Sequence, residues 1–206
     1  LLKHRGITNL VTDLSLYEDM SECKRIGFMT TITFDVASQE IFTALLNGLT
    51  GVLMPERRET KTDTIIQKIV EHKVDIIYAT TTYLDSLTNT KEKAGALASS
   101  VKICVLAGEA FAVNDHLART EGIRFYNQYG PAETHVATAA RISSLKDIHI
   151  GKPIANTQIY IVDTFMNPVP IGVTGELCIA GDCVGAGYLN RPDLNKEKFV
   201  KNPFGK

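Results

Sequence analysis

The chain has 206 residues, of which 44% are hydrophobic and 22% charged, and its formal net charge is −1. This composition is typical of a folded globular protein and excludes a disordered or fibrous chain. The balance of charges argues against nucleic acid as a ligand, and no apolar run reaches the ~18 residues of a transmembrane helix. Four cysteines without C-x-x-C spacing indicate reduced thiols in a cytoplasmic protein: Cys23, Cys104, Cys178 and Cys183.

In the first 147 residues, short apolar runs alternate with helical stretches, which is typical of parallel strands joined by helices. Helices are predicted at Ala37–Leu46 and at Thr62–His72, where the apolar side chains recur at helical spacing. We therefore expect a doubly wound, mostly parallel sheet with flanking helices. Its strands are predicted at Ile26–Thr33, Gly51–Met54, Val74–Tyr78, Lys102–Leu106 and Ile123–Tyr126.

The texture of the sequence changes after about Ser144, where proline and glycine become frequent. Short strands are predicted at Gln158–Val162 and Gly175–Ala180, with a turn-rich stretch between them. This pattern favours a small antiparallel β subdomain. We place the boundary between Ser143 and Lys152, which divides the chain into an α/β part, residues 1–147, and a β-rich segment, residues 148–206.

Ligands of open parallel sheets bind beyond the carboxyl ends of the strands, so the residues that follow each predicted strand are candidate site residues. Asp35 follows the first strand and suits either the N-cap of a helix or the binding of an ammonium group. Glu109 is either an acid in the first turn of a helix or part of a site. The loop NQYGPAETH, Asn127 to His135, is the most specific feature. Its aromatic ring, amide and carboxylate suit a planar base and a phosphate-bound Mg²⁺, although a plain turn is the alternative.

Three motifs, which follow one another along the chain in the family's order, resemble those of amino-acid adenylation domains of nonribosomal peptide synthetases. These domains are adenylate-forming, AMP-binding enzymes. The segment NQYGPAET is similar to the family's NxYGPTE motif, and FDVASQEIF, from Phe34 to Phe42, is similar to its FDxS segment. The third, GELCIAGDCVGAGYLNRPDLNKEKF from Gly175 to Phe199, resembles GELxIxGxGVARGYLxRPxLTxxxF. The chain departs from these patterns at Ala132, Cys183 and Ala186, where the family usually has Thr, Gly and Arg.

The resemblance implies that the domain forms an aminoacyl-AMP from ATP and an amino acid and then loads the phosphopantetheine thiol of a peptidyl carrier protein. Asp35 would pair with the α-ammonium of the amino acid, and Glu133 would hold the Mg²⁺ that accompanies ATP. The family's chemistry depends on positioning and charge neutralisation, so no residue is predicted to act as a nucleophile. The nucleotide would contact Gly108, Glu109, Ala110, Asn127, Tyr129, Gly130, Ala132 and Glu133.

The same resemblance implies an amino-acid pocket with no charge besides Asp35, so a charged substrate side chain would be buried without a partner. Proline or another small neutral amino acid is the predicted substrate, although Gln128 and Ala137 depart from the pattern that selects proline. The pocket maps onto Asp35, Val36, Gln39, Tyr78, Val105, Ala107, Gln128, Val136 and Ala137. Among the five histidines, we expect only His135 near the site and the others in surface or packing positions.

The family's phosphate loop would precede the stretch HRGITNL, and its ribose-binding Asp and carboxylate-binding Lys would follow the last residue. We therefore expect a central fragment of an adenylation domain that is inactive alone. Because a cut within the sheet exposes an apolar edge or face, we also expect this fragment to associate or to be only marginally stable. Two alternatives remain open. One is a relative that activates acyl or aryl acids, which Asp35 disfavours because those substrates lack an α-ammonium. The other is a non-catalytic nucleotide-binding or interaction module with the same fold.

Overall fold

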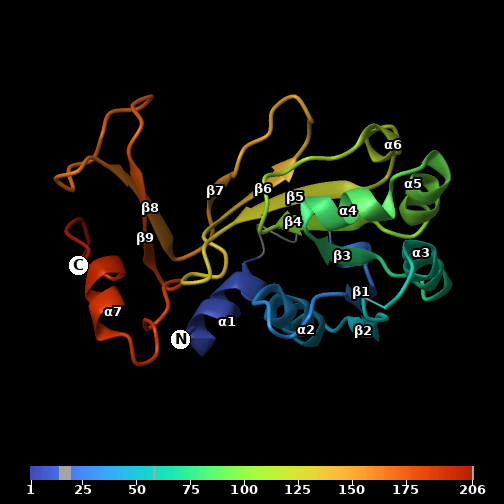
Figure 1. The fold of residues 1–206 in the computed structure, drawn as a ribbon, viewed down its shortest axis with the longest axis horizontal. Helices are drawn as coiled ribbons and strands as arrows, with labels where there is room; N and C mark the ends of the chain where they lie inside the picture. Colours follow the sequence, from blue (N-terminus) through green and yellow to red (C-terminus); the bar gives the residue numbers. More distant parts are fainter. Residues whose placement is uncertain (14–19, 58, 206) are drawn as a thin grey trace.

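A computed structural model of the chain describes residues 1–13, 20–57 and 59–205 (Figure 1). Its main element is a seven-stranded sheet with the strand order β2-β1-β3-β4-β5-β6-β7. The first five strands are parallel, and β6 and β7 extend the sheet in antiparallel pairing. The strands are β1 (Arg25–Phe28), β2 (Thr50–Leu53), β3 (Ile76–Ala79), β4 (Ile103–Ala107), β5 (Arg124–Tyr129), β6 (Thr138–Ile142) and β7 (Lys152–Pro153).

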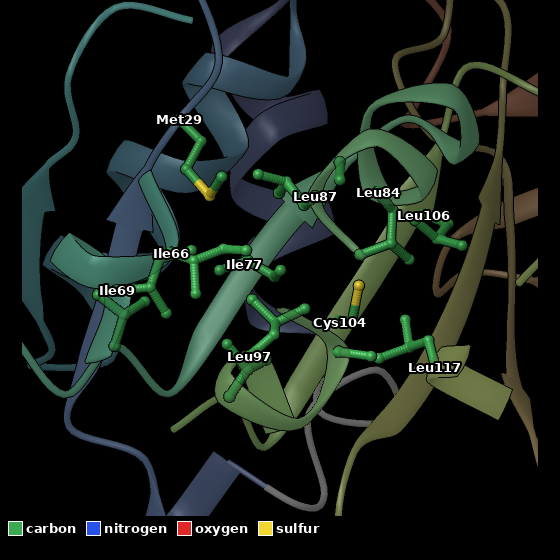
Figure 2. Packing of buried hydrophobic residues seen from close by; sticks show 14 of the residues in the cluster. Met29, Ile66, Ile69, Ile77, Leu84, Leu87, Leu97, Cys104, Leu106 and Leu117 are labelled. Atoms are coloured by element: carbon green, nitrogen blue, oxygen red, sulfur yellow. The ribbon is translucent and has the colours of Figure 1, made fainter. Parts of the chain in front are cut away.

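Helices cover both faces of this sheet, as predicted. Side chains of α3, α4, α5 and α6 enter one apolar cluster with β3 and β4, whereas α1 and α2 pack on the opposite face. Figure 2 shows the first cluster, in which Leu97 of α5 lies close to Ile77 and Cys104 of the strands. The helices are α1 (His4–Thr12), α2 (Val36–Leu46), α3 (Thr62–Glu71), α4 (Thr81–Leu87), α5 (Lys91–Ala98) and α6 (Asp115–Ala118), with a 3₁₀ turn η2 (Met20–Glu22) before β1.

The strand register decides which side chains share a face. Tyr78 of β3 is paired with Val105 of β4, which is paired with Tyr126 of β5, and one row further along Ala107 is paired with Gln128. Because successive side chains of a strand alternate between faces, these residues all point to the side covered by α1 and α2. Their neighbours in sequence, such as Cys104 and Leu106, belong to the cluster on the other side.

A smaller β-rich part of the molecule lies at one end of the large sheet, beside α1 (Figure 1). It consists of a two-stranded antiparallel sheet, β8 (Thr157–Val162) and β9 (Glu176–Gly181), followed by α7 (Pro192–Lys198). The antiparallel pairing of the predicted strands is confirmed. The boundary at residues 147 and 148 stays a prediction: β7 lies beyond it and still pairs with β6 of the large sheet.

The first predicted strand, Ile26–Thr33, is wrong at its end, since β1 stops at Phe28. The backbone N–H groups of Met29 and Thr30 donate to the carboxylate of Glu40 at 3.1 Å, instead of continuing the ladder. Glu40 comes from α2 and is almost fully buried, at 1% exposure. A buried side chain therefore ends this strand, which leaves residues 29–35 as the loop that leads to Asp35.

The structure also describes the cysteines and the length and character of the helices. All four cysteines are free, and burial raises the pKa of the Cys104 thiol to about 12. In the part of the chain that the structure describes, no helix has the length and apolar character needed to cross a membrane.

Candidate functional site

The loop that follows β5 is held in a tight turn at the carboxyl edge of the sheet. A Cβ atom on Gly130 would lie 2.4 Å from the carbonyl oxygen of His135, so only glycine fits at this position. The N–H of Ala137 donates to the carbonyl of Tyr129 at 2.8 Å and closes the loop. The Tyr129 side chain stays 39% exposed, which leaves its ring accessible at the end of the strand.

Glu133, at the tip of this loop, is held from two sides by the segment that follows β9. The Tyr188 hydroxyl donates to Oε1 of Glu133, and the N–H of Gly185 donates to its backbone carbonyl at 2.8 Å. The hydrogen bond from Tyr188 lowers the pKa of the Glu133 carboxyl from its usual value and raises that of the phenol. The carboxylate is thus ionised at neutral pH and fixed in place.

The turn after β4 lies next to the start of α4. Gly108 has a positive φ of 82°, a conformation that suits glycine, and Glu109 and Ala110 are exposed. The Glu109 carboxylate accepts the N–H of Thr82 at 2.7 Å, which lowers the pKa of that carboxyl. The interpretation of Glu109 as an acid in the first turn of a helix is therefore wrong, since no helix begins at this residue; its carboxylate instead accepts an N–H from the first turn of α4, a neighbouring element.

Asp35 caps α2, as one of the two interpretations of the sequence expected. Its Oδ1 accepts the N–H of Val36 at 2.8 Å, and the side chain is half-buried. This contact uses one carboxylate oxygen and does not exclude a second role, because an ionised carboxylate accepts several hydrogen bonds.

His135 joins the loop after β5 to the loop before α2. Its Nε2 lies 2.8 Å from the backbone carbonyl of Asp35, a distance at which the ring N–H donates to that oxygen. The residue is buried and has a positive φ of 64°, an unusual conformation for a non-glycine residue. Burial lowers the pKa of the imidazole, so the neutral ring is favoured. The prediction that His135 lies near the site is thereby supported by a direct contact.

Four of the nine residues assigned to the amino-acid pocket share one apolar cluster on the face covered by α1 and α2. Tyr78, Val105 and Val136 belong to one apolar cluster there, with Val36 packed against it. Gln128 is 3% exposed, and its Oε1 has no hydrogen-bond partner among the described residues. Gln39 and Ala137 are fully buried, while Ala107 and Asp35 are half-buried. The set is thus mostly apolar and buried, and it includes two buried amides and one half-buried carboxylate.

Two surface cavities are lined by other residues. One of about 490 Å³ lies between α3 and α5 and is lined by Ile66 and Val70, among others. The second, of about 270 Å³, lies beside β6 and β7 and is lined by Tyr126 and His149, among others. None of the nine pocket residues lines either cavity, so the pocket assignment stays a prediction about these residues.

Three contributions to the site were not predicted from the sequence. The backbone carbonyl of His149 accepts a hydrogen bond from Nδ2 of Asn127 at 2.9 Å, which ties the chain at His149 to β5, while the residue itself is exposed. Glu40 anchors the loop before Asp35 through Met29 and Thr30. The third contribution is Tyr188, which belongs to the third motif but has no sequence spacing that connects it with Glu133. Its contact with Glu133, 55 positions away, is visible only in the folded chain.

The donor set of the loop suits magnesium bound together with phosphates better than a cage made of protein alone. Within residues 1–13, 20–57 and 59–205 there is no group of three or more His, Cys, Asp or Glu side chains that could hold a metal ion. Mg²⁺ is commonly bound by one or two carboxylates together with phosphates of a nucleotide and water. The single fixed carboxylate of Glu133 matches that requirement.

An open parallel sheet with a glycine-containing, acid-tipped loop at its carboxyl edge defines the class of α/β proteins that bind ligands at that edge. The comparison with known families is more specific. The family model described as "AMP-binding enzyme" matches residues 1–189, and the chain belongs to that family.

The curated relatives are much longer proteins. The chain is 35% identical to gramicidin S synthase 2 of Brevibacillus brevis over 99% of its own length, but it spans only 5% of that protein. It is 34% identical to tyrocidine synthase 1 of Brevibacillus parabrevis and spans 19% of it.

Solved structures of nonribosomal peptide synthetases share the fold. The synthetase FmoA3 is 28% identical and superposes with a TM-score of 0.87, over 98% of this chain and 23% of that one. The four-domain synthetase AB3403, solved bound to AMP and glycine, is also 28% identical, with a TM-score of 0.84 over 98% of this chain and 15% of that one. The predicted family and fold are therefore confirmed.

Proposed function

We propose that this chain is part of an ATP-dependent adenylation domain that converts an amino acid into an aminoacyl-AMP and transfers it to the phosphopantetheine thiol of a peptidyl carrier protein. The product would be a nonribosomal peptide. The relatives are synthetases of such peptides, and AB3403 was solved with both AMP and an amino acid bound.

One observation carries the proposal: the two halves of the predicted site are joined by His135. The loop that ends in Tyr129 to Glu133 is the proposed nucleotide side, and Asp35 is the proposed amino-acid side. The 2.8 Å contact from His135 to the Asp35 carbonyl fixes these two loops to each other. An enzyme that joins an amino acid to a nucleotide needs this proximity, because holding two reactants in place removes most of the entropic cost of their encounter.

The chemistry assigned to each residue follows from its position. Tyr129 offers its exposed ring to the adenine, beside Gly108 and Ala110 of the neighbouring turn. Glu133 would hold Mg²⁺, which neutralises the phosphate charge when it is bound. Asp35 would bind the α-ammonium and so orient the carboxylate of the amino acid toward the α-phosphate of ATP. No side chain is needed as a nucleophile, because the attacking oxygen belongs to the substrate.

The pocket wall favours a small neutral side chain, and proline remains the specific hypothesis. Its buried members Tyr78, Val105 and Val136 are uncharged, so a charged substrate group would lose its hydration without gaining a partner. Gln128 offers an amide oxygen to a substrate that can donate a hydrogen bond.

An aryl-acid activator is the second candidate within this chemistry. The N-terminal subdomain of Klebsiella oxytoca NpsA, solved with 3-hydroxybenzoyl-AMSN, superposes with a TM-score of 0.83, but at 23% identity this likeness concerns the fold alone. Asp35 favours the hypothesis that the substrate is an amino acid, because a carboxylate at the edge of the pocket has no partner on an aryl acid.

The test is ATP–pyrophosphate exchange by a protein that carries residues 1–206 within an intact adenylation domain. Each amino acid and a set of aryl and aliphatic acids would be supplied singly. Exchange driven by a neutral amino acid is the expected result, and exchange driven by proline supports the specific hypothesis. Exchange driven only by acids without an amine, or no exchange from folded protein that binds ATP, would contradict the proposal.

A further inference from the structure

The segment between β9 and α7 crosses directly over the loop that bears Glu133. The N–H of Gly185 donates to the Glu133 carbonyl at 2.8 Å, and the N–H of Ala186 donates to the Leu1 carbonyl at 2.7 Å. A Cβ atom on Gly185 would lie 2.8 Å from the Leu1 oxygen and 2.9 Å from the Glu133 oxygen. A Cβ atom here would force the neighbouring backbone to shift, and the close approach brings the following residues to the carboxylate.

Tyr188 is held in position by α7. Its N–H donates to Oδ1 of Asn195 at 2.6 Å, and its carbonyl accepts Nδ2 of the same side chain at 3.0 Å. The ring packs edge-on against Phe199, with centroids 5.5 Å apart and an interplanar angle of 80°. Backbone and ring are thus fixed independently, and the hydroxyl reaches Glu133 of the nucleotide loop.

The hydroxyl donates to Oε1 of Glu133, a residue that reaches solvent at the mouth of the site. A carboxylate held by a neutral donor keeps its negative charge while its orientation is restricted, whereas a lysine or arginine in the same place would cancel that charge. Hydrogen bonds of this kind to a metal ligand typically change metal affinity about 10- to 100-fold.

We propose that Tyr188 is a positioning residue that orients the Glu133 carboxylate for the magnesium ion of the bound nucleotide. This inference rests on the proposed function of Glu133 as the residue that holds Mg²⁺. Through this contact the third motif would support the nucleotide site, although Tyr188 lies 55 residues from Glu133 in the chain.

The test compares Tyr188→Phe with the wild type in a protein that contains the intact adenylation domain. The substitution keeps the ring that packs on Phe199 and removes only the hydroxyl. The measurement is equilibrium binding of a non-hydrolysable ATP analogue at increasing magnesium concentration. We expect about tenfold weaker binding at limiting magnesium, equal binding by both proteins in excess EDTA, and an unchanged KM for the amino acid.

Tyr160→Phe is the matched control. Tyr160 lies on β8 and packs on Phe204 at a centroid distance of 4.7 Å, so the same hydroxyl is removed from a similar ring pair in the same part of the molecule. Its magnesium dependence should equal that of the wild type. In a Glu133→Gln background, Tyr188→Phe should have no further effect on magnesium dependence, because the carboxylate on which it acts is gone.

The proposal is overturned if Tyr188→Phe and the wild type share one magnesium dependence, or if the wild type binds the nucleotide equally well with and without magnesium. Failure of the proposed function would give a different experimental result. In that case no amino acid drives pyrophosphate exchange in the wild type, while magnesium-dependent nucleotide binding still separates Tyr188→Phe from Tyr160→Phe.

Discussion

The two faces of the large sheet are built from the same strands but differ in what they bury. On the face covered by α3 to α6, Leu97, Cys104 and Leu106 are fully buried in a continuous apolar cluster (Figure 2). On the face covered by α1 and α2, the cluster contains Tyr78 and Val105, and Gln128 is a buried polar side chain on the same face. Glu40 of α2 is also buried, beside the end of β1. One face is therefore organised for stability, and the other accepts polar groups at a cost to stability.

The buried polar groups differ in part between the two faces, although the Tyr83 hydroxyl on the α3 side also has no hydrogen-bond partner among the described residues. On the α3 side, the Thr88 hydroxyl donates to the Leu84 carbonyl at 2.8 Å, and the Ser100 hydroxyl donates to the Val74 carbonyl at 3.0 Å. On the α2 side, the Gln128 Oε1 has no such partner, and burial raises the pKa of Glu40 to about 7. Proteins retain costly buried polar groups mainly where a ligand or a conformation requires them.

The largest effect on stability should come from the apolar face. Leu97→Ala is expected to destabilise the domain by about 2–5 kcal/mol, because it leaves a cavity in a fully packed cluster. Urea unfolding measures this change. The control Leu97→Met nearly conserves volume and should cost less than about 1.5 kcal/mol. Comparable losses from both variants would contradict the close packing described for this face.

The next effect is a dependence of stability on pH that arises from Glu40. Burial favours the protonated acid, so the folded state holds a proton that the unfolded state releases, and the pKa is about 7 in the fold against 4.5 in the unfolded chain. The contribution is complete below about pH 4.5 and is lost as the pH rises toward 7. The difference corresponds to about 3 kcal/mol. Glu40→Gln should remove this slope in urea unfolding.

Two other ionisable groups, Arg57 and His135, must be considered in that experiment. Arg57 faces Glu40 and lowers its pKa, which limits the slope. His135 acts in the opposite direction: burial lowers its pKa, so its contribution is lost as the pH falls below about 6.5. The decisive quantity is therefore the difference between the wild type and Glu40→Gln at pH 5 and pH 8. A constant difference would contradict a buried, protonated Glu40.

A smaller change in stability is expected at Gln128, with a larger one in function. Gln128→Met replaces an amide whose oxygen is unpartnered, so the free energy of unfolding should change by no more than about 1 kcal/mol. The KM for the amino acid should change by about tenfold or more if the amide lines the pocket. Leu106→Met, on the neighbouring strand and the opposite face, is the control and should leave the KM unchanged. A KM unaffected by Gln128→Met would remove this residue from the pocket.

The sequence predicted the sheet well because buried parallel strands are short and apolar, as in Ile103–Ala107. It failed where a distant side chain competes with the local pattern. The β-branched run after Phe28 continues to favour a strand, but Glu40 binds the N–H groups of Met29 and Thr30. Local propensity does not contain that contact, which forms only when α2 packs on the sheet.

The site was predicted in the same uneven way. The motif around Tyr129 identified the loop because its turn is local and needs glycine at position 130. Asp35 was interpreted as either a helix cap or a ligand, and the capping contact is present in the structure. The roles of His135 and Tyr188 depend on partners 100 and 55 positions away, which no local pattern encodes.

The central claim is that the α2 face carries an amino-acid site whose ammonium partner is Asp35. The most direct measurement is pyrophosphate exchange with the preferred amino acid and with its analogue that lacks the amine (cyclopentanecarboxylic acid if the amino acid is proline), in the wild type and in Asp35→Asn. Asparagine also caps helices, so α2 and the melting temperature should be preserved. We expect the wild type to favour the amine by at least about 30-fold and Asp35→Asn to lose that preference. An Asp35→Asn protein that still discriminates fully would show that Asp35 only caps the helix and would contradict the account.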